Sequence, residues 1–177
     1  MCELTLSAFK RPCATPSGIT SVIISDVFAN DEAGLSFTVA DGAASIVGTG
    51  GTAYRINQDD FVATLTQPIT ADRTSNSFMY ELTLEMKLDG TSASINTLVS
   101  EMVRGRVVAF AVYTNGDIKA IGIERGASVT GGDAGASGTG MGDAKGATIT
   151  LTESSTIPAP NIAIDAITTA FTITEPA

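Results

Sequence analysis

The stretch SFMYELTLEMKL, residues 77–88, decides the fold class of this chain. Apolar residues occupy every second position and would share one face of a strand, namely Phe78, Tyr80, Leu82, Leu84, Met86 and Leu88. The intervening positions are mostly polar. This period of two is typical of an antiparallel strand with one face in a core and one in solvent. The length of the stretch suggests that it spans a whole sheet.

The residues that follow predict one helix. Ile95, Leu98, Val99, Met102 and Val103 recur at helical spacing, so one face of a helix at about residues 92–104 would be apolar. Thr91 or Ser92 could cap its start, and Gly105 suits the position after its end. We expect this single helix to pack against a sheet.

The rest of the chain favours β structure. Two strands should meet at Asn115-Gly116, since this pair favours a type I′ turn. Further strands are predicted at 18–28, in the first half of 34–51 before a glycine-broken loop, around 61–66, at 147–154 and at 162–174. The expected fold is therefore mainly β, a β-sandwich or barrel with one packed helix and extended loops or terminal arms. One domain would cover 1–177, with an N-terminal arm at 1–17.

Composition narrows the range of functions. The net charge of −9 argues against a conventional nucleic-acid binder, although it suits a surface past which DNA must slide. The chain has no histidine, which removes histidine general bases and the commonest zinc ligand. No apolar run approaches the roughly 20 residues of a membrane helix. Cys2 and Cys13 could form one disulfide or stay reduced in a cytoplasm, and both readings stay open.

The glycine-rich stretch GGDAGASGTGMGDAKG, residues 131–146, is the most unusual segment. A phosphate-binding loop would need Lys-Ser/Thr and a following helix, but Lys145 precedes Gly146 and a strand. Asp133 and Asp143 lack the alternating ligand pattern of a calcium loop. We therefore expect a long loop between strands that is either disordered alone or ordered by a partner. We expect no catalytic residue, metal or cofactor.

Three segments resemble structural proteins of tailed bacteriophages that infect Bacteroidetes-type bacteria. The first is an N-terminal segment of the form Cys…Cys…Gly-Ile, made by Cys2, Cys13, Gly18 and Ile19. The others are RGRVVAFAVYTNGDIKAIGIERGASVTGG, at the end of the helix, and SGTGMGDAKGATITLT. The order of strands around one helix is similar to the phage tail tube family and to tube proteins of contractile injection machines. The resemblance covers roughly residues 54–153.

This resemblance implies a virion protein of the tail, made in the host cytoplasm. Copies would form rings, which are usually hexamers in the family, around a channel. A tape-measure protein would occupy this channel during assembly, and DNA would later pass through it. No membrane is implied. Inter-subunit contacts would then fall on Arg104, Arg106, Asp133, Ser137, Met141 and Lys145. Acidic residues facing the channel would be Glu81, Glu85 and Asp117.

Other functions remain open at this point. A head decoration or head–tail joining protein belongs to the same broad class of virion proteins. An adhesive or carbohydrate-binding β-domain is a candidate from another class. Paired carboxylates such as Glu81 and Glu85 fit a solvated sheet face better than an enzyme's acid and base.

Overall fold

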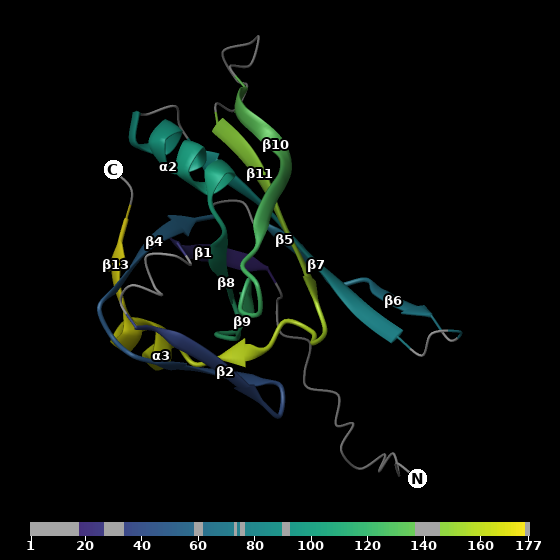
Figure 1. Ribbon diagram of the computed structural model, residues 1–177. Helices are drawn as coiled ribbons and strands as arrows, with labels where there is room; N and C mark the ends of the chain where they lie inside the picture. The colour runs from purple at the N-terminus through teal and green to yellow at the C-terminus, as the bar shows by residue number, and fades with distance from the viewer. Residues whose placement is uncertain are drawn as a thin grey trace.

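The structure of this protein is a computed structural model. It describes residues 18–26, 34–58, 62–72, 74, 77–89, 93–136 and 146–175. Within these ranges the chain is mainly β, with two sheets in a sandwich-like arrangement and a packed helix, as predicted (Figure 1). The predicted N-terminal arm, with both cysteines, lies outside the described residues.

The smaller sheet is built around the stretch that decided the fold class. Strand β7 is 13 residues long and pairs with β11 over ten residues. Its other edge pairs with two short strands, one after the other. All pairs are antiparallel, and the strands are β10 (Ser128–Ala136), β11 (Gly146–Ser155), β7 (Ser77–Asp89), β5 (Thr64–Thr66) and β6 (Ile69–Asp72).

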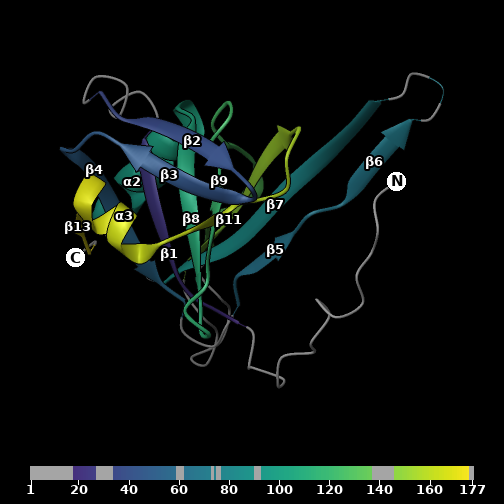
Figure 2. The ribbon, with the colours of Figure 1, turned by 90° about the horizontal axis from the view of Figure 1, so that it is seen from below.

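The larger sheet has eight strands and carries β1 and β8 near its middle. Its order is β13 (Phe171–Thr174), β4 (Gly51–Asn57), β1 (Ile19–Asp26), β8 (Val107–Tyr113), β9 (Ile118–Ile121), β12 (Asn161–Ile162), β3 (Ala43–Val47) and β2 (Ser36–Ala40). Helix α3 (Ile164–Ala170) contacts both β13 and β3, which lie near opposite ends of this order. The sheet is therefore curled, and α3 fills the space between its ends (Figure 2).

Two apolar cores lie on either side of the larger sheet. Val22 and Ile24 of β1 face the smaller sheet, whereas Ile23 faces the inside of the curl with Phe110. Leu82, Leu84, Met86 and Leu88 of β7 are all buried in the first core, as their alternation predicts. Burial on both faces explains why β1 and β8 are nearly continuous apolar runs.

Helix α2 (Ala93–Arg104) closes the first core at one end and contacts β10. Leu98, Val99 and Met102 are buried, as their spacing predicts. The Gly105 amide donates to the Glu101 carbonyl at 3.0 Å, and the chain then enters β8. The predicted helix is thus confirmed, and it sits beside the glycine-rich segment.

The predicted strand at 162–174 is wrong. It is divided into β12, helix α3 and β13, so the chain has a second helix that the sequence analysis did not predict. Ile167 and Ala170, three residues apart, are both buried while Thr168 and Thr169 between them are exposed, which is helical rather than alternating burial. The Thr168 hydroxyl donates to the Ile164 carbonyl one turn earlier, so its polar group is satisfied within the helix.

Two loop predictions also need correction. The segment predicted as a glycine-broken loop forms the β2–β3 hairpin, whose Asp41 and Gly42 both have positive φ. The hairpin at Asn115-Gly116 is confirmed, but only Gly116 has positive φ, so the turn is not type I′. Asn115 instead accepts a hydrogen bond from the Asp117 amide at 3.0 Å, an arrangement that stabilises a longer turn.

The glycine-rich segment is not entirely a loop. Residues 131–136 belong to β10 and pair with β11, and Gly146 begins β11. A Cβ at Gly132 would lie 2.1 Å from the Thr148 carbonyl oxygen, so glycine permits a close approach of the two strands at a bulge. Residues 137–145 lie outside the described residues.

Candidate functional site

The outer face of the smaller sheet is a polar surface built by four strands. Because cross-strand neighbours share a face, the register builds a row of four hydroxyl side chains across four strands. This row consists of Thr66, Thr83, Thr152 and Ser128. The next row carries Thr64, Glu85, Thr150 and Gly131, and a third carries Lys87, Thr148 and Asp133. We call these rows, together with the neighbouring pair of Glu81 and Ser154, the hydroxyl face.

Two predicted channel residues belong to this surface. Glu81 and Glu85 are exposed and, four residues apart on β7, point to the same side. Glu85 accepts a 3.5 Å hydrogen bond from the Thr64 hydroxyl, while Glu81 lies opposite Ser154. Asp117, the third predicted channel residue, lies in the β8–β9 turn of the larger sheet, where Asn115 Nδ2 donates to it at 2.6 Å. The structure therefore brings together two of the three.

The predicted contact residues fall into two groups. Arg104 is exposed at the end of α2, and Asp133 is exposed on β10, the strand that α2 contacts. Arg106 is also exposed, but its guanidinium donates to the Arg125 carbonyl at 2.8 Å and so supports the turn after β9. Ser137, Met141 and Lys145 lie outside the described residues.

Sequence analysis missed a pair of structural carboxylates at the turn of residues 122–126. Glu153 on β11 is buried, and its two oxygens accept the amides of Gly122 at 2.6 Å and Glu124 at 3.3 Å. Burial raises the pKa of Glu153, although these amide hydrogen bonds oppose the shift. Because Glu153 follows Ile149 and Leu151 at alternate positions, alternation was a usable signal that it would face inward, although not that it would bind a turn.

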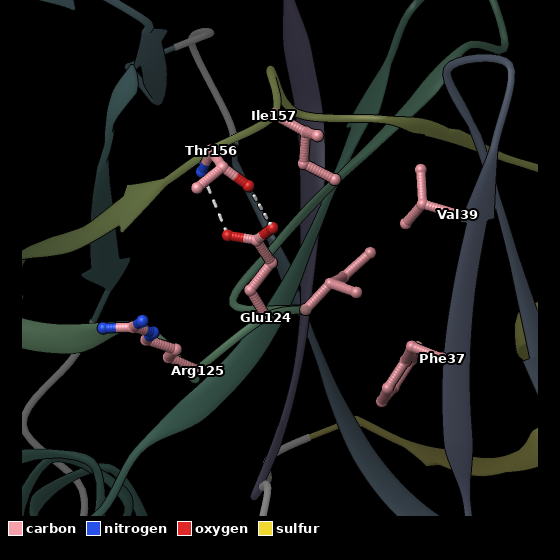
Figure 3. A pocket seen from close by; sticks show the side chains of 7 residues that line it. Phe37, Val39, Glu124, Arg125, Thr156 and Ile157 are labelled. Carbon is pink, nitrogen blue, oxygen red and sulfur yellow. Dashed lines mark hydrogen bonds between the residues drawn. The ribbon is translucent and has the colours of Figure 1, made fainter. Parts of the chain in front are cut away.

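Glu124 holds the other side of the same turn. Its carboxylate accepts the Thr156 hydroxyl at 2.7 Å and the Thr156 amide at 3.0 Å (Figure 3). The hydroxyl of Thr156 is the main reason that the pKa of Glu124 is lowered. Both oxygens of Glu124 are thus occupied by the chain itself.

An open groove of about 590 Å³ lies between this turn and strand β2. Apolar side chains line one side, and the Glu124 carboxylate points to Thr156 rather than into the space (Figure 3). Arg125 extends away from Phe37 and Val39. The groove is lined by Phe37, Val39, Ile123, Glu124, Arg125, Thr156 and Ile157.

The described residues offer neither a metal site nor a membrane-spanning helix. Over the described ranges, no cluster of three or more cysteine, aspartate or glutamate side chains is arranged to hold a metal ion. None of the described helices combines the length and apolar character needed to cross a membrane.

Comparison with known proteins gives no assignment. No protein-family model matches the chain, and no curated protein sequence matches it significantly.

Proposed function

We propose that this chain is a virion structural protein, a phage tail tube subunit whose copies assemble into stacked rings around a channel for DNA passage. The observation that carries this proposal is the hydroxyl face. It presents threonine and serine side chains across four strands, and its charged groups include Glu81, Glu85 and Asp133 against Lys87.

Such a face suits a wall along which DNA moves. Adhesion of proteins to DNA comes largely from lysine and arginine contacts with phosphates, which release counterions. Neutral hydroxyls with an excess of carboxylates make few such contacts and repel the phosphates at short range. The net charge of −9 for the whole chain acts in the same direction.

The partners of this function follow from the resemblance to tail tubes. Copies of the chain would form rings, as hexamers, and the rings would stack into a tube in the virion tail. A tape-measure protein would fill the channel during assembly in the bacterial cytoplasm. DNA would later pass without specific binding.

The groove beside Glu124 favours a second candidate, a carbohydrate-binding or adhesive β-domain. Phe37 offers an aromatic surface there, and the Arg125 and Thr156 side chains supply polar groups at its border. A monomer that binds particular glycans on an array, with loss of binding in Phe37→Ala, would favour this candidate over the tube.

Charge reversal on the hydroxyl face tests the tube proposal. The double variant Glu81→Lys/Glu85→Lys should assemble into rings but co-sediment with double-stranded DNA at low salt far more than wild type. The control Glu101→Lys/Asp165→Lys makes the same change in net charge on the two helices, away from this face. Equal DNA binding by both variants would contradict a channel lined by the hydroxyl face.

A further inference from the structure

The arm formed by β6 and the first part of β7, residues 69–72 and 77–80, projects away from the two cores (Figures 1 and 2). Phe78 and Tyr80 lie on the side of β7 that buries Leu82 farther along the strand. Ile69 pairs with Tyr80, and Ala71 pairs with Phe78, so both residues of β6 share this side. The apolar side of β7 therefore continues past the core onto the arm.

Tyr80 packs against the first core, but beyond it this apolar side of the arm is uncovered within the described part of the chain. Ile69 is 64% exposed and Phe78 is 60% exposed, while the Phe78 and Tyr80 rings meet edge to face at 6.2 Å. Contiguous exposed apolar side chains of this kind mark interaction sites. A ribbon of only two strands is also marginally stable by itself, so a partner on this side would stabilise it.

Helix α2 and strand β10 lie at the end of the smaller sheet opposite the arm (Figure 1). A hollow lies between them. Val99 and Val103 of α2, Val129 of β10 and Ile149 of β11 form its apolar wall, and Val103 is 60% exposed. Its volume is about 150 Å³. An apolar space of that size accommodates one benzene ring. We call it the α2–β10 groove.

We propose that the arm of one copy docks into the α2–β10 groove of a second copy, with the Phe78 ring as its anchor. Arm and groove lie at opposite ends of one sheet, so this contact is head-to-tail and repeats from copy to copy. A contact between two different surfaces of the same chain produces a ring or a filament. The inference rests on the proposed function and identifies the surfaces through which its copies join.

The test compares two neighbouring residues on opposite sides of the arm. Phe78→Ser should raise the concentration for half-maximal association by about tenfold or more, because a buried aromatic side chain contributes at least that factor. Met79→Ser is the control, since Met79 is 43% exposed but faces the other side of β7. Met79→Ser should change the concentration for half-maximal association by less than about twofold, which is near the effect of an ordinary surface substitution. Sedimentation velocity measures both, and circular dichroism checks that each variant is folded.

A photo-crosslinking amino acid at position 78 locates the partner surface. In a mixture of isotope-labelled and unlabelled protein, mass spectrometry should find cross-links between copies at residues 99–103 or 129–134. Cross-links within one chain, for instance to residues 1–17, would overturn the proposal. So would unchanged assembly of Phe78→Ser, or a wild-type chain that stays monomeric at the highest attainable concentration.

These outcomes separate this inference from the proposed function. Assemblies joined through the groove but lacking stacked rings would keep the arm contact and refute the tube. Stacked rings that form equally well with Phe78→Ser would keep the tube and refute the arm contact.

Discussion

Gly122 shows how single residues set the turn between the larger and the smaller sheet. Its φ is +87°, and an added Cβ would lie 2.3 Å from the Val107 carbonyl oxygen. Gly116 has nearly the same φ, +88°, but open space around it. Gly122→Ala should therefore lower the free energy of unfolding by about 3 kcal/mol or more, through strain and overlap together. Gly116→Ala should cost only about 1–2 kcal/mol, the cost of the left-handed conformation. Urea unfolding measures both, and equal losses would contradict this account of the turn.

The two carboxylates at this turn should respond to pH in opposite directions. Burial raises the pKa of Glu153, so the folded chain holds its proton to higher pH than the unfolded chain does. Stability from this group is therefore full below the ordinary pKa, about 4.3, and falls as pH rises through the raised value. The lowered pKa of Glu124 contributes stability above the ordinary value, which is lost as pH falls through the lowered one.

Two glutamine variants separate these contributions. The stability of wild type relative to Glu153→Gln should decrease as pH rises from about 4. The stability of wild type relative to Glu124→Gln should increase as pH rises toward the ordinary value, about 4.3, and stay level above it. Urea midpoints between pH 3 and pH 8 give both curves. Two flat differences would show that neither carboxylate is perturbed in the folded chain.

Helix α3 shows what a short element contributes. It has only seven residues, yet it contacts strands near both ends of the curled sheet. Ile167→Ala should cost about 2–5 kcal/mol because its side chain is fully buried in the second core. Ile164→Ala, on the exposed side of the same helix, should cost less than about 0.5 kcal/mol. Thermal unfolding of both variants checks this, and similar losses would show that α3 does not close the sheet.

Elements with a strong period were predictable from sequence. The alternation at residues 77–88 predicted β7, and the helical spacing from Ile95 to Val103 predicted α2. The spacing of apolar residues in 162–174 does not distinguish a strand from a helix. Ile162 and Ile164 are spaced as in a strand, whereas Ile164 and Ile167 are spaced as in a helix. In so short a segment, packing against both ends of the larger sheet decides the outcome. Asp41-Gly42 was a usable turn signal that the sequence analysis overlooked.

The candidate surfaces were only partly predictable for a related reason. Strand alternation placed Glu81 and Glu85 on one polar side, as the structure has them. Alternation within single strands could not predict the row of hydroxyl side chains, because that row depends on the register of four strands far apart in sequence. Nor could it show that Phe78 leaves the core, since its alternation continues unchanged into Leu82. Whether the Phe78 side chain is buried depends on how far the larger sheet extends along β7.

At the scale of the whole molecule, the parts of the smaller sheet act together in the proposed assembly. Its inner side carries the first core and, at its two ends, the arm and the α2–β10 groove. Its outer side carries the hydroxyl face. Copies joined head-to-tail through the inner side would leave the outer side free, where it could line a continuous polar wall.

The most direct test of this account is an electron cryo-microscopy reconstruction of the purified protein at high concentration. We predict stacked rings around an open channel, with the outer face of β5, β7, β11 and β10 along the channel wall and Glu85 pointing into it. Isolated single copies, or rings in which this face lies on the outside, would contradict the account.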